Sequence, residues 1–105
     1  MDLSQMEPNA EKAAKLLTAM AHPKRLLVLC QLVKGELSVG TLVESSGLSQ
    51  SALSQHLAKM RSSELVKTRR EAQTIYYSLA SKEVEAILST LYELYCADEE
   101  EQAQL

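Results

Sequence analysis

Two short helical patterns separated by one glycine constrain the fold of this chain more than any other feature. Ser38 can cap the first helix, and Gly47 can adopt a positive φ in the turn that follows it. Ser49 can cap the second helix, which continues to about Ser63. Residues 38–63 therefore predict two short helices joined by a tight turn.

The second of these helices, which begins "SQSALSQHL", has an unusual exposed side. On a helical wheel Leu53, Leu57 and Met60 share one narrow arc, which predicts the buried side. The opposite arc carries small, mostly uncharged residues, namely Ser51, Gln55, Ala58 and Ser62, flanked by Ser54 and Lys59. Such donors and acceptors suit the base edges of the DNA major groove, and the pair of helices predicts a helix-turn-helix. The alternative is a helix packed on a neighbour, with serines that allow close approach.

The rest of the chain predicts a mainly α-helical fold with one two-stranded β-hairpin. Three glycines and two prolines leave little room for a larger sheet. Alternating apolar and polar residues in "LVKTRREAQTIYYSL" predict two strands with a basic tip near Arg69–Ala72. This hairpin follows the second helix directly, as the wing does in a winged helix-turn-helix.

Three further helices complete the prediction. Asn9 can cap a first helix that ends near Met20, and Ser81 can cap a long amphipathic last helix. The helix that starts at Pro23 has an apolar stripe made of Leu26, Leu27, Cys30 and Val33. We expect one domain over residues 1–105, with an ordered core at about 9–97 and an acidic tail at 98–105.

The charge is unevenly distributed. The net charge is −3, yet residues 50–82 carry six Lys and Arg against two acids, and residues 83–105 carry seven acids and no base. A basic middle favours an anionic partner, although a solvated surface with an acidic tail would give the same pattern. No apolar run is long enough to span a membrane and no secretory signal is present, so we expect a cytoplasmic protein.

These patterns together predict a DNA-binding protein and no enzyme, because the chain has no nucleophile–base set and no phosphate loop. The expected DNA contacts are Gln50, Ser51, Ser54 and Gln55 on base edges, Lys59 on a phosphate, and Arg69, Arg70 and Gln73 in the wing. His56 lies on the shoulder of the buried side and is expected to be a half-buried packing residue. A winged helix that binds proteins in place of DNA is the rival interpretation.

Three segments closely resemble the ArsR/SmtB family of bacterial winged-helix repressors: "LLTAMAHPKRLLVL", "ELSVGTLVESSGLSQSALSQHLAKMRSSELV" and "KTRREAQTIYYSL". The resemblance covers about residues 10–97. It implies a homodimer joined through the first and last helices. It also implies binding of double-stranded operator DNA with an imperfect inverted repeat, and repression until an inducer arrives.

The metal-binding positions of this family are not matched. Ser38 and Gly40 stand where arsenic- and cadmium-type members place thiols, and soft metalloids need thiolates. Residues 81–105 contain no histidine, which the zinc-type site of the last helix requires. We therefore expect no metal and no other cofactor.

Cys30 and Cys96 remain to be explained. Both could be small core residues, which fits Cys30 well and Cys96 less well. One cysteine in each of these two helices resembles the sulfide- or persulfide-responsive subgroup of the family, carried by "LLVLCQL" and "LYCADE". That resemblance implies reactive sulfur species as the inducer, a disulfide or longer sulfur bridge, and release of DNA. A thiol-based oxidant sensor of the same fold is the alternative.

Overall fold

The structure is a computed structural model that describes residues 1–96, so the predicted tail at 98–105 lies outside the described residues. The elements run in the order α1 (Leu3–Met6), η1 (Glu7–Asn9, a 3-10 helix), α2 (Ala10–Met20), α3 (Pro23–Leu32), β1 (Leu37–Ser38), α4 (Val39–Ser46), α5 (Gln50–Ser62), β2 (Val66–Glu71), β3 (Thr74–Leu79) and α6 (Lys82–Tyr95). Within the described chain, none of these helices combines the length and the apolar character that a membrane crossing requires.

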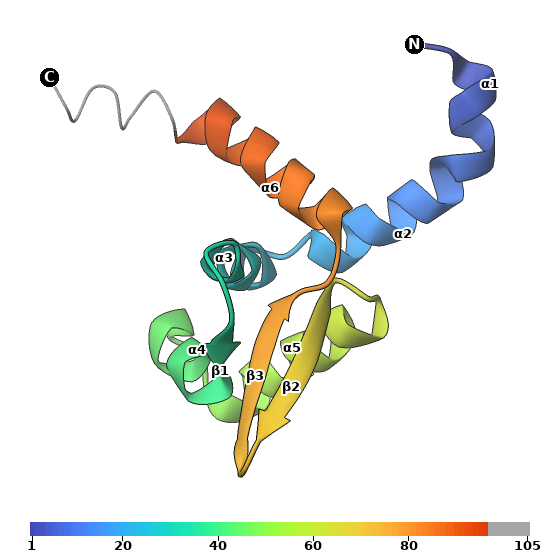
Figure 1. The fold of residues 1–105 in the computed structure, drawn as a ribbon. Helices are drawn as coiled ribbons and strands as arrows, with labels where there is room; N and C mark the ends of the chain where they lie inside the picture. The colour runs from blue at the N-terminus through green and yellow to red at the C-terminus, as the bar shows by residue number, and fades with distance from the viewer. Residues whose placement is uncertain (97–105) are drawn as a thin grey trace, which may run out of the picture.

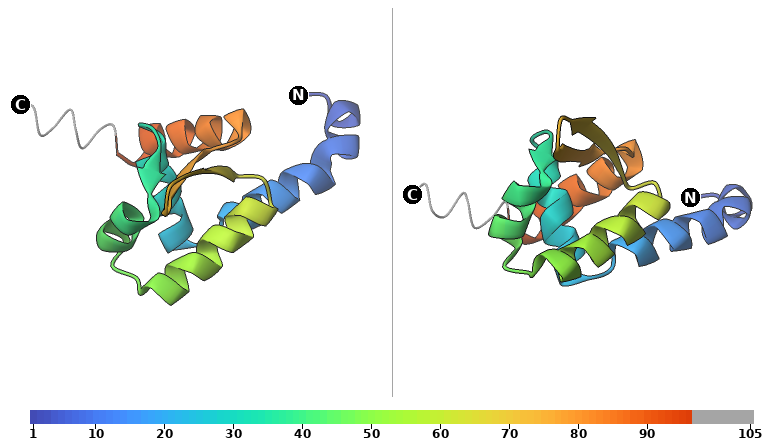
Figure 2. Two further views of the ribbon diagram at one scale, coloured as in Figure 1. Left: turned by 60° about the horizontal axis from the view of Figure 1, so that its bottom comes forward. Right: turned by 90° about the horizontal axis from the view of Figure 1, so that it is seen from below.

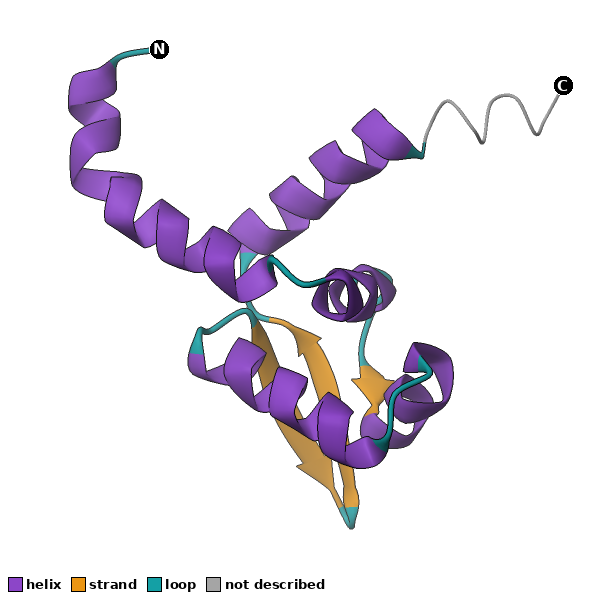
Figure 3. Ribbon diagram, turned by 180° about the vertical axis from the view of Figure 1, so that it is seen from behind, coloured by secondary structure: helices purple, strands orange, loops and turns teal. Residues whose placement is uncertain are grey.

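The helices and the sheet form a winged helix-turn-helix, as predicted. α3, α4, α5 and the sheet enclose the core, while α2 and α6 project outward from the same side of this body (Figure 1). Seen from behind, α5 crosses one face of the sheet (Figure 3). The core is mainly aliphatic, and its fully buried side chains are Val28, Leu29, Leu42, Leu53, Leu57, Met60, Leu65 and Val84.

The predicted hairpin is confirmed, but the sheet has three strands where two were expected. β2 and β3 pair antiparallel from Val66 opposite Leu79 to Glu71 opposite Thr74. Two residues, Ala72 and Gln73, connect them, and Ala72 has a φ of 55°. The short strand β1 adds to the other edge of β3, in the order β1-β3-β2. A strand of two residues is too short to show an alternating pattern, so the sequence could not reveal it.

Most of the predicted helix ends are confirmed. The side chains of Ser38, Ser49 and Ser81 accept hydrogen bonds from backbone N–H groups in the first turns of α4, α5 and α6. Asn9 directly precedes α2, which ends at Met20 as predicted, but the predicted capping bond is absent, and the Asn9 Nδ2 donates instead to the carbonyl of Gln5. The chain is already helical from Leu3, so Asn9 lies inside a continuing helical path and has no free first turn to cap.

The buried side of α3 also differs from the prediction. Val28, Leu29 and Leu32 are buried, whereas Leu27, Cys30 and Val33 are exposed. The segment "LLVLCQLV" is apolar on almost every side, so its periodicity fits more than one stripe. Packing against α4, α6 and β3 selects the stripe that is buried. Cys30 is therefore not a core residue.

Two glycines at different backbone conformations allow a paired stability test. Gly47 has a φ of 71°, so Gly47→Ala should lower the free energy of unfolding by about 1–2 kcal/mol. Gly40 lies inside α4, and a methyl group added there would meet only Ser38 Oγ, at 3.9 Å. Gly40→Ala should therefore raise the free energy of unfolding by about 0.5–1 kcal/mol. Urea unfolding of both variants measures the changes. Changes of the same sign would contradict the backbone assignments.

Candidate nucleic-acid interface and cysteine pair

The five expected contact residues of α5 are all exposed. Gln50, Ser51, Ser54, Gln55 and Lys59 lie away from the side on which Leu53, Leu57 and Met60 are 0–1 % exposed. α5 lies along the surface of the molecule in both views of Figure 2. One side of this helix therefore builds the core while the other presents uncharged hydrogen-bonding groups and one lysine to solvent.

A concave surface lies between α5 and β3. It is lined in part by Gln50, Ser54 and Arg61 from the helix and by Ile75 and Tyr77 from β3. Gln50 and Ser54 thus face toward the wing, whereas Ser51 and Gln55 lie further round the helix. The expected contacts on α5 are brought together on one exposed region, but they point in two directions.

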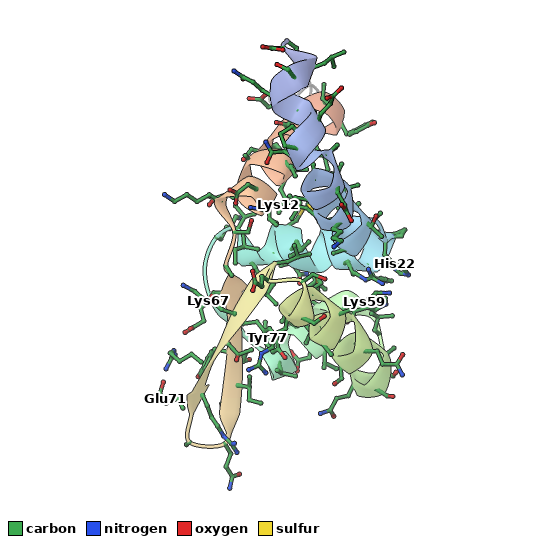
Figure 4. All side chains as sticks on the ribbon, turned by 90° about the vertical axis from the view of Figure 1, so that its right-hand side faces the viewer. Lys12, His22, Lys59, Lys67, Glu71 and Tyr77 are labelled. Carbon is green, nitrogen blue, oxygen red and sulfur yellow. The ribbon has the colours of Figure 1, made fainter. Side chains whose placement is uncertain are left out.

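Arg61 is a candidate that sequence reasoning missed. It follows Ser54 by seven residues, which places both on one side of the helix. Arg61 also lines a second concave surface, between α2, the end of α5 and β2, together with Lys12, Lys59 and Lys67. Figure 4 looks onto this side, where the three labelled lysines surround the end of α5. The heptad spacing to Ser54 was the signal that could have identified Arg61.

The wing residues divide into two groups. Gln73 lies in the turn at the tip, and Arg70 Nε donates to the carbonyl of Ala72 beside it at 3.2 Å. Both side chains are exposed where the hairpin extends farthest from the body. The tip is therefore polar and basic.

Arg69, by contrast, is held by acidic neighbours. Its Nε and Nη2 donate to the two carboxylate oxygens of Glu36 at 3.0 and 2.6 Å, and its Nη1 donates to Glu71 at 2.8 Å. Its guanidinium also lies over the ring of Tyr76, 4.6 Å from the centroid. The Arg69 bond lowers the pKa of Glu36, so both charges persist at neutral pH. A phosphate would have to compete with two carboxylates for Arg69.

His56 is half-buried, as predicted. Arg25 Nε donates to its Nδ1 at 3.1 Å, and the ring of His22 lies 4.5 Å away. Burial, followed by the charges of His22, Arg25 and Lys59, lowers the pKa of His56. The histidine therefore belongs to the packing between α3 and α5 and lies off the exposed side of the helix.

The two cysteines lie on neighbouring helices. Cys30 is an exposed residue of α3, and Cys96 is the partly exposed C-cap of α6, whose N–H donates to the carbonyl of Tyr92. α3 and α6 pack against each other. Burial raises the pKa of the Cys30 thiol, and the negative charge of a Cys96 thiolate raises it further. The two thiols therefore lie on helices that contact each other, and both are free in this structure.

Residues 1–96 contain no cluster of three or more His, Cys, Asp or Glu side chains that could hold a metal ion. Both histidines use Nδ1 as a hydrogen-bond acceptor, from Lys24 N–H and from Arg25. Within this described part of the chain, the functional candidates are thus the surface of α5 and the wing, and the pair of thiols.

Comparison with known proteins agrees with this geometry. The model of the bacterial regulatory protein arsR family matches residues 22–68. The chain is 55% identical to the transcriptional activator HlyU of Vibrio cholerae, over 91% of this chain and 89% of that protein.

Solved structures of transcription regulators also superpose on this chain. The transcriptional repressor BigR from Xylella fastidiosa superposes with a TM-score of 0.87 at 40% identity, covering 92% of this chain and 99% of that one. A structure described as reduced HlyU from Vibrio cholerae has a TM-score of 0.83 at 55% identity, covering 88% and 97%. The relatives are named as transcription regulators, which are non-enzymatic DNA-binding proteins. The chain belongs to the arsR family of bacterial transcription regulators.

Proposed function

We propose that this regulator binds operator DNA as a homodimer and releases it when reactive sulfur species link Cys30 to Cys96. The observation that carries the proposal is that two free, accessible cysteines lie on α3 and at the end of α6, two helices that pack against each other. A relative at 55% identity has a structure described as its reduced form, which supports redox chemistry in this branch of the family.

The DNA contacts follow from the exposed side of α5. In a helix-turn-helix the second helix enters the major groove, where side-chain amides and hydroxyls hydrogen-bond to bases. We assign this role to Gln50, Ser51, Ser54 and Gln55. We assign phosphate contacts to Lys59, Arg61 and Arg70, with Gln73 at the tip of the wing.

The dimer contact is assigned to the projecting helices. Leu3 and Leu17 on the N-terminal helices are 69 % and 51 % exposed, and Leu94 and Tyr95 on α6 are 68 % and 72 % exposed. Exposed apolar residues on helices that project from the body are typical of a surface covered by a partner. A second copy suits this surface because closed two-fold pairing would present two α5 helices, as an inverted repeat requires.

The proposed chemistry uses a persulfide as the oxidant. The Cys96 thiolate attacks the outer sulfur of a low-molecular-weight persulfide, a Cys96 persulfide forms, and the former carrier leaves as a thiolate. Cys30 then loses its proton and attacks Cys96 Sγ, which forms the disulfide and expels hydrosulfide. If Cys30 is itself persulfidated first, its outer sulfur attacks instead and a trisulfide forms with loss of hydrosulfide. The raised pKa of Cys30 supports this order, because it lowers the fraction of Cys30 thiolate available for the first attack.

The bridge would tie α3 to the end of α6. Because α6 also carries the proposed dimer surface, a link to α3 changes the position or freedom of both reading helices. DNA is released if the bridged dimer populates the DNA-competent arrangement less than the reduced dimer does. Peroxide is the competing inducer, and it would give a plain disulfide through a sulfenic acid.

Gln55→Ala tests the assignment of base contacts. The variant should lose about 1–3 kcal/mol of discrimination between operator and unrelated duplexes for each lost base contact. Fluorescence anisotropy with both duplexes at one salt concentration measures this. Gln5→Ala, which removes an exposed glutamine from α1, serves as the control. Unchanged discrimination in Gln55→Ala would contradict the assignment.

Arg70→Ala and Arg69→Ala test the division of the wing. Arg70→Ala should weaken binding to all duplexes. It should also reduce the steepness of the salt dependence, which is the slope of log affinity against log salt concentration, by about 1. Arg69→Ala should change the slope much less, because Glu36 and Glu71 already compensate its charge. Titrations at several salt concentrations compare the two variants. Equal changes in the salt dependence of the two variants would mean that Arg69 exchanges its ion pairs with Glu36 and Glu71 for a DNA phosphate when DNA binds.

Cys30→Ser and Cys96→Ser test the switch. Both variants should bind operator about as well as the parent and should keep it after persulfide treatment. Intact mass under non-reducing conditions should show the parent losing two hydrogens within one chain, with added sulfur for a longer bridge. Separate treatment with peroxide distinguishes the two inducers. Release of DNA by persulfide-treated Cys96→Ser would refute the two-thiol mechanism.

A further inference from the structure

The first turn of α3 is joined to three other helices by side-chain hydrogen bonds. Lys24 Nζ donates to the carbonyl of Ser46 at the end of α4 at 2.9 Å. Arg25 Nη1 donates to the carbonyl of Ala19 near the end of α2 at 3.0 Å, and its Nε donates to His56 on α5 at 3.1 Å. Basic residues at helix C-terminal carbonyls stabilise those ends. Arg25 thereby connects α2 to the proposed reading helix.

The two histidines at this junction both accept a hydrogen bond at Nδ1. His22 Nδ1 accepts the N–H of Lys24 as the cap of α3, and His56 Nδ1 accepts the Nε–H of Arg25. A ring nitrogen that accepts a hydrogen bond carries no proton, so the contact with Arg25 requires a neutral His56 with its proton on Nε2. Their centroids are 4.5 Å apart.

We propose that Arg25 is a positioning residue for α5, acting through neutral His56, and that protonation of His56 breaks this contact and lowers operator preference. A protonated His56 cannot accept from Arg25, because both of its nitrogens would then be donors. The inference rests on the proposed reading side of α5, since His56 directly follows Gln55 in that helix.

The surroundings of His56 favour its neutral form. The ionisable groups that act on it come from three places: His22 at the start of α3, Arg25 one turn later, and Lys59 on α5 itself. All three are basic, so each opposes a positive charge on His56. Figure 4 shows His22 and Lys59 on the same side of the molecule, with α5 below the α2–α3 connection. Burial adds to the effect, and the pKa of His56 is lowered.

The sign of the pH effect follows from that lowered pKa. Above the ordinary histidine value both the folded and the unfolded chain carry neutral His56, and the contact is complete. As the pH falls through the lowered folded value, the native state must accept the proton and the contact is lost. Leu53, Leu57 and Met60 remain buried, so we expect α5 to shift in place and the core to stay folded.

Operator preference as a function of pH tests this proposal. The operator is obtained by selecting random duplexes on the full-length parent protein. Affinity for this duplex and for an unrelated duplex of equal length is then measured between about pH 8 and pH 5.5, across the histidine range. The ratio of the two affinities removes the general gain in attraction that any added positive charge gives.

Two variants separate His56 from His22. His56→Gln keeps an acceptor for Arg25 but does not titrate, so its ratio should stay nearly flat. His22→Asn keeps a cap for α3 without a titrating ring, so its ratio should still fall. The parent ratio should fall as the pH drops below the ordinary histidine value, and the total fall should reach about fivefold to tenfold once His56 is protonated, as expected for losing one hydrogen bond of ordinary net strength. In Arg25→Met, the ratio of operator affinity to unrelated-duplex affinity should be lower than in the parent at every pH. This ratio should not change further as the pH falls.

Histidine NMR on the DNA-free protein gives a second readout. The parent should show neutral His56 with the proton on Nε2, and a titration midpoint below that of the unfolded chain. A fall in the ratio of His56→Gln equal to that of the parent would overturn the proposal, as would an unchanged ratio in Arg25→Met. If Gln55→Ala shows no loss of discrimination while His56 titrates as stated, the error lies in the reading side of α5 and not in the Arg25–His56 contact.

Discussion

The burial of one side of α5 is the constraint on which the rest of this structure depends. Leu53, Leu57 and Met60 are almost completely buried, and they contribute to the same core as Leu29 and Leu42 from α3 and α4. Because these three side chains set the rotation of the helix, they also determine which residues face solvent. Specificity of a DNA-reading helix in this fold is therefore a consequence of core packing as much as of the polar residues themselves.

Charge is arranged so that only part of the basic surface is available to an anion. Arg69 is compensated by Glu36 and Glu71 and stacked on Tyr76, so its main effect is to join the wing to the segment before β1. Exposed ion pairs of this kind add little to stability, but a bidentate pair restricts orientation. The tip of the wing, with Arg70, is thereby presented in a defined direction.

The helices α3 and α6 connect the two candidate functions. α3 contacts α5 through Arg25 at its first turn and carries Cys30 near its last turn, and it packs against α6, which ends at Cys96. A covalent bond between the thiols would therefore act on the same helix that holds α5 in place. Packed helices and one hydrogen bond therefore connect the cysteine-bearing part of α3 with the proposed DNA-reading surface of α5.

The sequence by itself determined the local features: the serine caps, the positive φ of Gly47, the hairpin, the buried side of α5 and the half-buried position of His56. Each depends on residues close together in the chain, where capping, turn preference and periodicity act. The tertiary structure decided the features that depend on distant partners. β1 exists only through its pairing with β3, Arg69 is compensated only because Glu36 lies beside it, and Arg25 reaches His56 across 31 positions. The uniformly apolar α3 could not indicate whether Val28 or Cys30 would be buried, because only the helices and strand packed against it make that choice.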